Sequence, residues 1–538
     1  MIEDIIVSQP ISLSMNPYTG AWTAAEAAHL LRRTMFGPTF QQIQNAVSNG
    51  MDNTVATLLT IPALTSQPLA YDPDEAVAPF GTTWVNTVYD LIDPQTTENA
   101  RYRSLKAWTN QRLNSTAFDI SEKMCLFWQN HFALYSVGDS RATYNYLMLL
   151  RSHALGNFRQ LIKDMTIDPA MLIFLNGKSN TGNSPNENYS RELLELYTLG
   201  KGVQIGPGDY STYTEDDVAA GAKIVSGWQI TGYRSDTLTT TASIFTPSRH
   251  DTSLKTLSNH FAFATVPDLG AAEYEYYIDT IFQHPACATF ICKKLYRFFV
   301  NYDLTTNVLN TIIPIMAQTL LVNNFNILPV MTQLLKSQHF YDIAVRGAVI
   351  KSPIDNIYSW LNASESAPLF DLDTDYKQYI RINSYCDALG QEYLRPPSVG
   401  GWTSYYQAPS YYKLWLNSTS LNNRFEIASK YTQQSGVTYN GNSFKLNALT
   451  LVDGLSIPND AISVIDDLCV VFCPKPVSQA EKDNLKSILT NGLPDFEWTI
   501  QYNDYIANPG VTGFSGPVRI RVELVVSSLF KMAQSLTA

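Results

Sequence analysis

The chain has 538 residues, of which 45% are hydrophobic and 16% are charged, and its formal net charge is -11 at pH 7. This composition indicates a globular protein with a substantial core and excludes a disordered chain. The negative charge comes without a concentrated basic patch, which disfavours nucleic acid and anionic membrane surfaces as partners. The sequence contains no run of eighteen apolar residues, so it predicts no membrane-spanning helix.

Residues 1–20 show turn chemistry without a helical or strand repeat, so we expect an irregular N-terminal arm there, and they lack the features of a signal peptide. Thr23 and Glu26 have the spacing of a capping box and predict a helix start. That helix would carry His29 and Arg33 on one face. Two roles for this pair stay open: a surface or capping role, and a part in an anion-binding pocket.

The pattern from about residue 100 to 165 is helical with little interruption. Within it, His131 falls on the same side of a helix as Phe127 and Leu134, which is an apolar face. Such a histidine is either a core residue with one hydrogen-bond partner or a functional group held in a dry environment. Both interpretations of His131 are kept.

The stretch from Ser184 to Gly202 predicts a further helix. Ser184 is suited to the N-cap, Pro185 to the first helical position, and Glu187 completes a capping-box spacing. Leucines recur at three and four residues, and glycines at 200 and 202 predict the stop. We expect about four helical turns.

This predicted helix also carries an unusual set of charges. Glu187, Arg191 and Glu195 are four residues apart, so the guanidinium would lie between two carboxylates. Asn188, Glu192 and Glu195 form a neighbouring row. The set is either a salt-bridged surface or, if Glu192 and Glu195 face a cavity, a catalytic group.

The middle of the chain contains a second capping box, a hairpin and a polar loop. Thr214 and Asp217 predict another helix start, and alternation over 229–247 predicts a short β-hairpin. His250 and Asp251 then lie in a loop, with Lys255 four residues later. Loops often carry chemistry, and this pair is able to bind a metal or transfer a proton.

The remaining half is again helical. The helix over 274–300 is expected to place Lys293 and Arg297 on a solvated face, and the Pro-Pro and Gly-Gly pairs within 390–402 position Trp402. We therefore predict a mainly α protein, a large multi-helix globular domain with long irregular loops and at most a small β-hairpin. Its predicted parts are the arm at 1–20, a main helical domain at 21–433 and a C-terminal helical segment at 444–538 packed on it, with the polar stretch 434–443 between them.

The run Asn186-Glu-Asn-Tyr-Ser-Arg-Glu-Leu-Leu-Glu-Leu-Tyr-Thr-Leu-Gly200 resembles the signature of a mostly bacterial family called "domain of unknown function 1800". Four further segments resemble motifs of that family in order: 29–33, 130–132, 250–255 and 390–402. The family has no established biochemistry. The resemblance implies an extracytoplasmic protein and a sulfatase-like protein partner. Members often have aspartate where this chain has Asn176, which counts against carrying over a metal site at that position.

The first functional hypothesis is an extracytoplasmic, metal-assisted hydrolase acting on an extracellular polymer or glycan. A divalent metal would lower the pKa of a bound water, and a glutamate would take its proton. The expected catalytic residues are Glu192, Glu195, His131, His250 and Asp251, with His131, His250 and Asp251 as metal ligands. The expected ligand-binding residues are Arg191, Asn188, Lys255 and Trp402.

Two alternatives remain beside the hydrolase. The protein could be a non-catalytic glycan-binding or assembly module that works with the sulfatase-like partner through Trp402 and the tyrosines that follow it. It could also perform metal-free acid/base chemistry with Glu192 and Glu195, although carboxylates three residues apart on one helix are poorly placed to flank a bond. Whether the protein is an enzyme, and whether it uses a cofactor, stay open at this stage.

Overall fold

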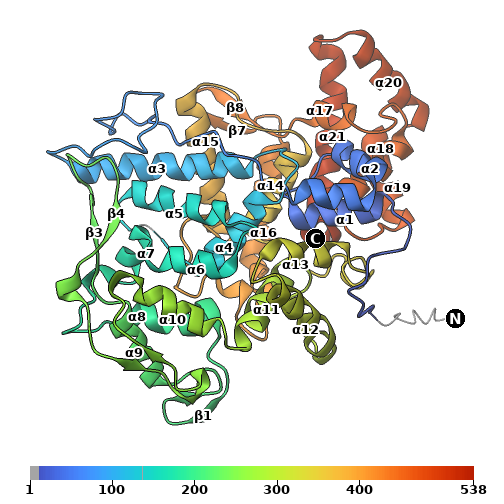
Figure 1. Cartoon of the computed structure of the whole chain (residues 1–538). Helices are drawn as coiled ribbons and strands as arrows, with labels where there is room; N and C mark the ends of the chain where they lie inside the picture. Colours follow the sequence, from blue (N-terminus) through green and yellow to red (C-terminus); the bar gives the residue numbers. More distant parts are fainter. Residues whose placement is uncertain (1–10, 136) are drawn as a thin grey trace.

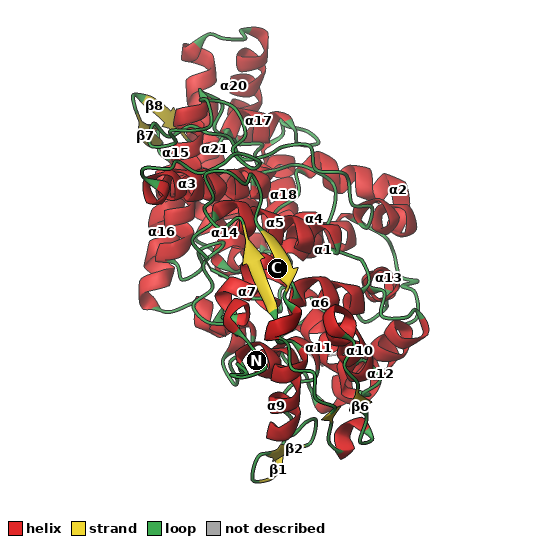
Figure 2. Ribbon diagram, turned by 60° about the vertical axis from the view of Figure 1, so that its left-hand side comes forward, coloured by secondary structure: helices red, strands yellow, loops and turns green. Residues whose placement is uncertain are grey.

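The protein is described from a computed structural model, which covers residues 11–135 and 137–538. Within these ranges helices make up nearly all of the regular structure (Figures 1 and 2). The predicted mainly α fold is thus confirmed. The α-helices are α1 (Ala24–Thr34), α2 (Phe40–Leu58), α3 (Pro94–Leu113), α4 (Ser121–His131), α5 (Ser140–Ser152), α6 (Phe158–Thr166), α7 (Pro169–Phe174), α8 (Asn188–Glu192), α9 (Glu215–Ile224), α10 (Glu273–Ile281), α11 (Ala286–Phe299), α12 (Thr306–Val322), α13 (Ile327–Lys336), α14 (Pro353–Ala363), α15 (Leu372–Ala388), α16 (Ser418–Thr432), α17 (Ala448–Asp453), α18 (Ala461–Phe472), α19 (Gln479–Thr490), α20 (Asp495–Ala507) and α21 (Thr512–Phe530).

The strands form antiparallel pairs only. The hairpin predicted over 229–247 is present as β3 (Trp228–Thr231) and β4 (Ala242–Phe245). Three further pairs have strands of two or three residues, too short for an alternating pattern to be visible in the sequence. These are β1 (Gln204–Gly206) with β2 (Asp209–Tyr210), β5 (Lys255–Thr256) with β6 (Thr265–Val266), and β7 (Val437–Tyr439) with β8 (Asn442–Phe444).

Two of the predicted helix starts are confirmed by their side-chain caps. Thr23 and Glu26 form a complete capping box at α1, and Thr214 and Asp217 form another at α9. Each box satisfies backbone N–H groups that have no partner inside the helix, which explains why the local sequence was sufficient. These two starts fix the entry of the chain into α1 and α9.

The central helix differs from its prediction. Ser184 pairs with Thr181 in an isolated bridge, and α8 begins only at Asn188. After Glu192 the chain continues as a π-helix, η2 (Leu193–Thr198), in which the N–H of Leu199 bonds to the carbonyl of Leu194. The predicted capping box at Ser184 is therefore wrong: Ser184 belongs to a turn with Thr181, closed by its N–H to the Thr181 carbonyl, and the helix starts four residues later without a side-chain cap.

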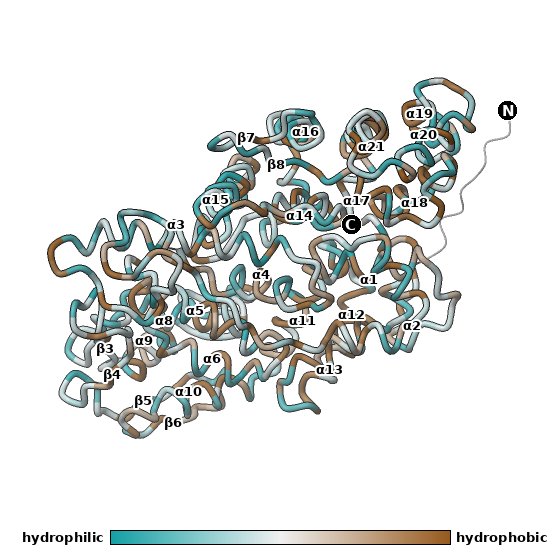
Figure 3. Tube along the Cα trace, turned by 90° about the horizontal axis from the view of Figure 1, so that it is seen from above, coloured by the Kyte–Doolittle hydropathy of each residue, from teal (hydrophilic) through white to brown (hydrophobic). Residues whose placement is uncertain are grey.

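The hydrophobic core runs without interruption from the N-terminal to the C-terminal helices. Helix α15 packs on α3, α1 on α2, and α11 on α12, while α18 contacts both α1 and α2. Seen from above, hydrophobic and polar positions alternate along most helices, as expected for amphipathic elements around a shared core (Figure 3). The C-terminal helices α17 to α21 thus share a core with the first two helices of the chain.

The stretch 434–443, expected to separate the main and C-terminal parts, is mostly the β7–β8 hairpin, and the side-chain amide of Gln378 donates to the carbonyl of Val437. Residues 11–20 are irregular, as predicted for the arm, and pair with residues 336–339 through backbone hydrogen bonds. The first ten residues of the predicted arm lie outside the described part of the chain. No helix in the described ranges is both long and apolar enough to cross a membrane.

One loop contact fixes the predicted Gly-Gly-Trp segment against α4. The side-chain oxygen of Asn130 accepts the backbone N–H of Trp402 at 2.9 Å. Gly401 has φ +90, and a Cβ atom there would lie 2.5 Å from the backbone oxygen of Asn130. Only glycine permits both this conformation and this approach.

We predict that Gly401→Ala destabilises the protein by about 3 kcal/mol or more, because left-handed strain adds to a steric conflict with Asn130. Gly390→Ala is the matched control, since Gly390 has φ +97 and open space around the Cβ position. It should cost only about 1–2 kcal/mol of strain. Chemical denaturation of both variants measures the difference, and equal losses would contradict a steric role for the Asn130 contact.

Candidate functional site

Two adjoining cavities share the wall residues Phe298, Tyr405 and Tyr412. We call them together the cationic cavity. Both are small: the volume open to a water-sized group is about 20 Å³ in the first and about 50 Å³ in the second. Six basic residues line them: Arg32, Arg33, Lys123, Lys351, Lys294 and Arg297. Three segments with family-like motifs, around residues 29–33, 130–132 and 390–402, thus contribute to or border one site.

Arg32 and Arg33 are buried and hold the C-terminal ends of two helices. Arg32 donates from Nε to the carbonyl of Val471 at 3.2 Å, at the end of α18. Arg33 donates from Nε to Phe299 at 2.9 Å and from Nη2 to Val300 at 2.6 Å, at the end of α11. Cations are favourable at these ends because the last carbonyl groups carry partial negative charge.

Lys351 is the least satisfied cation of the cavity. The residue is only 4% exposed, and its Nζ donates one hydrogen bond, to Ser359 Oγ at 3.3 Å. Burial, with a further contribution from the positive charge of Arg32, lowers the pKa of Lys351 to about 7. The Asp355 carboxylate on the same wall forms its ion pair with Lys123 instead.

His131 and Lys294 bind the end of the π-helix η2. His131 Nε2 lies 3.1 Å from the carbonyl of Tyr197, and Lys294 Nζ lies 2.9 Å from the carbonyl of Leu196 and 3.0 Å from His131 Nδ1. Burial and the charge of Lys294 lower the pKa of His131 well below its usual range. The ring is therefore neutral, donates from Nε2 and accepts at Nδ1, so neither nitrogen is free for a metal.

The cavity carries an excess of positive charge. Arg297 donates to the hydroxyl of Tyr411 at 3.0 Å, and burial lowers the pKa of Lys294 to about 7. Of the six cations only Lys123 forms an ion pair with an Asp or Glu carboxylate within residues 11–135 and 137–538. Among the other five, Arg32, Arg33 and Lys294 donate to backbone carbonyl groups, and Lys351 and Arg297 donate to hydroxyl groups. Such an arrangement favours a negatively charged occupant.

The carboxylates of the central helix have different partners. Arg191 forms ion pairs with Glu187 at 3.0 Å and Glu215 at 2.7 Å, and Glu195 accepts from the hydroxyl of Tyr213 at 3.0 Å. The predicted Arg191–Glu195 pair is wrong, because the π-helix that begins at Leu193 breaks the four-residue spacing. Asn188, predicted to bind ligand, is exposed at the start of α8.

Glu192 is partly buried and has no hydrogen-bond or ion-pair partner among the described side chains. Burial, followed by repulsion from Glu195, raises the pKa of Glu192 to about 7. A carboxyl group that titrates near neutral pH is suited to general acid/base chemistry. This is the property that the sequence-based hypothesis required of Glu192.

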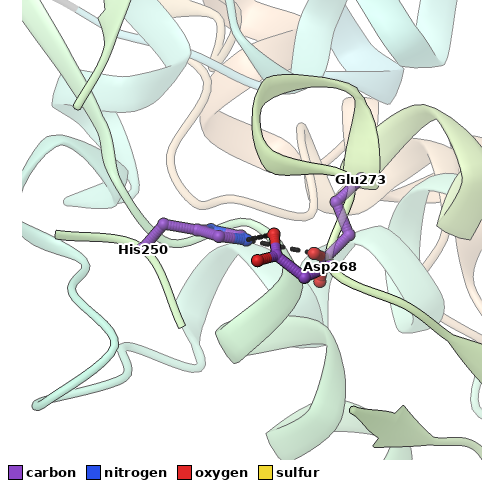
Figure 4. A group of neighbouring side chains, drawn as sticks. All are labelled: His250, Asp268 and Glu273. Atoms are coloured by element: carbon purple, nitrogen blue, oxygen red, sulfur yellow. Dashed lines mark hydrogen bonds and ion pairs between the residues drawn. The ribbon is translucent and has the colours of Figure 1, made fainter. Parts of the chain in front are cut away.

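His250, Asp251 and Lys255 come together with two acidic residues that the sequence analysis missed. His250 Nε2 lies 3.0 Å from Glu273 Oε2 and 3.8 Å from Asp268 Oδ1, and Lys255 Nζ lies 2.6 Å from Glu273 Oε1 (Figure 4). His250, Lys255 and Glu273 are buried, whereas the Asp268 side chain is 43% exposed. Asp251 instead accepts hydrogen bonds from Ser253.

The predicted metal set of His131, His250 and Asp251 is not assembled. In the described part of the chain, the group of side chains positioned to share a metal ion is His250, Asp268 and Glu273. Trp402, predicted to bind ligand, is only 2% exposed and packs in the core, and it borders a cavity separate from the cationic cavity, together with Leu414 and Trp415. Arg297, expected on a solvated face, lines the cationic cavity.

Sequence reasoning missed Lys123, Lys351, Asp268 and Glu273 because none belongs to a local pattern. Each becomes notable only through a partner far along the chain, such as Asp355 for Lys123. One signal was available for Lys351: it directly precedes Ser352 and Pro353, which begin α14. A lysine before a helix start is nevertheless common and would not by itself have indicated a site.

A family model described as "Protein of unknown function (DUF1800)" matches residues 29–501. No curated protein and no solved structure matches the chain. The matched range includes every cationic residue of the cavity and the whole His250 group.

We predict that Glu192→Gln stabilises the protein more at pH 8 than at pH 5. The pKa of Glu192 rises from 4.5 to about 7 on folding, so the folded protein binds the proton more tightly. The free energy of unfolding contributed by this group therefore falls as the pH rises from about 4.5 to about 7, and glutamine removes that loss. Thermal unfolding across this pH range measures it, with the exposed Glu426→Gln as control. A difference in unfolding free energy between wild type and Glu192→Gln that does not change with pH would contradict the raised pKa of Glu192.

Proposed function

The chain belongs to the DUF1800 family, whose description assigns no activity, and we propose that it binds an acidic ligand through a sulfate, phosphate or carboxylate group held in the cationic cavity. The observation that carries this proposal is the set of five basic side chains, all but Lys123, that line adjoining cavities without an ion pair to an Asp or Glu side chain in the described part of the chain. Arg33 also donates to Ala538 O at 3.3 Å. The protein as a whole has a net charge of -11, so this local excess of positive charge is opposite to its average.

The energetics of buried charge support an anionic occupant. Taking a cation out of water costs several kcal/mol unless an anion or strong dipoles replace the lost hydration. Carbonyl groups at helix ends do so for Arg32 and Arg33, but Lys351 has one hydroxyl partner and Arg297 has one. A bound anion would complete the hydrogen bonding of these two side chains and restore the full charge of Lys351.

The walls limit the kind of ligand. Phe298, Tyr405 and Tyr412 lie between the two parts of the cavity, so apolar and aromatic surface alternates with the charges. The space left between the wall atoms is too small for a whole sugar ring, and a single charged group would enter only with movement of the side chains that line it. An acidic glycan or polymer would insert one such group, with the remainder of the molecule outside. The extracytoplasmic location and the sulfatase-like partner implied by the family resemblance stay predictions.

Metal-assisted hydrolysis is the second candidate function. The observation that favours it is the grouping of His250, Asp268 and Glu273, which is different from the ligand set expected from the sequence. A hydrolase would also need a substrate cleft beside that group. Binding of an acidic ligand requires no such addition and is therefore our first proposal.

The proposal is tested by titrating sulfate into wild-type protein and Lys351→Met while thermal unfolding is followed at constant ionic strength. We expect a saturable rise in Tm for wild type at millimolar sulfate, larger at pH 6 than at pH 8 because Lys351 is protonated below about pH 7. Lys351→Met should weaken binding at least tenfold, about 1.4 kcal/mol, yet be no less stable than wild type without sulfate, since it removes a poorly compensated buried charge.

Lys377→Met is the matched control, because Lys377 forms an ion pair with Asp373 at 2.8 Å and is not among the residues that line the cationic cavity. It should keep the wild-type response to sulfate. A wild-type Tm that rises only linearly with salt, or a Lys351→Met variant that responds like wild type, would refute an anion site in this cavity. Inorganic phosphate in place of sulfate then separates a preference for one anion from general anion binding.

A further inference from the structure

We propose that His250, Asp268 and Glu273 bind one divalent metal ion of the zinc type, independently of the acidic-ligand site. The three ligand atoms come from a loop after β4, from the segment before α10 and from the first residue of α10. They all lie within 4.8 Å of one another. Figure 4 shows the histidine ring edge pointing at both carboxylates.

The tautomer of His250 is the first step of the argument. Its Nδ1 lies 2.9 Å from the carbonyl oxygen of Ser226, which only accepts hydrogen bonds, so Nδ1 carries the hydrogen. The hydroxyl of Ser226 donates to the carbonyl of Lys223 at 2.6 Å and accepts the N–H of Asp251 at 2.9 Å, which leaves it unable to donate to Nδ1. In the neutral ring, Nε2 is therefore a bare acceptor.

The second step is what Nε2 faces. It meets Glu273 Oε2 at 3.0 Å and Asp268 Oδ1 at 3.8 Å, so three electron-rich atoms point at one region. Only a proton on Nε2 or a bound cation makes this arrangement favourable. A histidine that donates its Nδ1–H to a backbone carbonyl and offers Nε2 is the usual orientation of a metal ligand.

The third step concerns the neighbouring lysine, which would otherwise neutralise the carboxylates. Lys255 Nζ contacts the other oxygen of Glu273, Oε1, at 2.6 Å and is 3.8 Å from Asp251 Oδ1. Apart from His250 Nε2, the partner of Glu273 Oε2 among the described residues is the N–H of Leu269, at 3.3 Å. In the described part of the chain, His250 is the one basic side chain within ion-pair distance of Asp268. Lys255 thus orients Glu273 without covering its ligand atom.

Geometry and donor type indicate the kind of ion. At ligand distances of about 2.0–2.2 Å, ligand atoms around zinc stand about 3.0–3.6 Å apart. The distances of 3.0 and 3.8 Å from His250 Nε2 are close to this range, and the two carboxylate oxygens, which lie within 4.8 Å of each other, would move together on binding. One imidazole nitrogen with two carboxylate oxygens suits zinc or a similar divalent transition metal. The exposed Asp268 leaves one side of the group open to solvent, so water would complete the coordination.

Isothermal titration of Zn²⁺ into untagged, chelator-treated full-length protein tests the proposal. We expect one ion per chain for wild type, loss of binding in His250→Gln and at least a tenfold weaker affinity in Asp268→Asn. The asparagine keeps the hydrogen bond that Asp268 Oδ1 accepts from the Gly270 N–H at 3.0 Å, so this exposed variant should fold normally. Asp236→Asn, another exposed loop aspartate, should bind like wild type.

Co²⁺ gives a second readout that does not depend on any enzymatic activity. A four-coordinate Co²⁺ site absorbs visible light far more strongly than the hydrated ion, and this absorption should appear with wild type and be lost with His250→Gln. Absence of stoichiometric Zn²⁺ binding by wild type would overturn the proposal. Equal affinity of wild type and Asp268→Asn would also overturn it, because binding would then lie elsewhere.

Discussion

Buried helix ends that need hydrogen-bond donors are the constraint on which the centre of this protein depends. The last carbonyl groups of a helix have no partner inside it, and within a core water is not available to replace them. Arg32 serves the end of α18, Arg33 the end of α11, and His131 with Lys294 the end of η2. Three helices from distant parts of the chain are thereby held around one point.

This solution has an electrostatic consequence. Donors for carbonyl groups need not be charged, but basic side chains bring several donors at once and interact favourably with the helix dipole. Using them at neighbouring helix ends concentrates positive charge in one place, and Lys351 and Arg297 add to it. The features that stabilise the fold therefore also create the surroundings that a negatively charged group would prefer, so structure and binding are coupled at this cavity.

The sequence predicted those parts whose causes are local. The capping boxes at Thr23 and Thr214 and the β3–β4 hairpin follow from residues close together in the chain, and the structure contains them. The helix start predicted at Ser184 is wrong because Ser184 pairs with Thr181 instead. Glu195 does not lie on the same helix face as Arg191 because a π-helix begins at Leu193, and no residue pattern predicts a π-helix. Likewise, His250 was selected from its loop, but Glu273, a partner 23 positions later at a helix start, was not.

The signature segment itself is better explained as a connector than as a row of catalytic carboxylates. At one end, the carbonyl groups of η2 are bound by His131 and Lys294 of the cationic cavity. Near the other end, α8 packs on α9, where Gly221 leaves room for the Ser190 hydroxyl and the nearby Tyr277. Helix α9 leads directly to Ser226, whose carbonyl sets the tautomer of His250. A continuous packed path thus joins the two proposed sites. The family-like segment 186–200 lies between them, so its residues would connect the two sites without contacting the acidic ligand or the metal ion proposed for them.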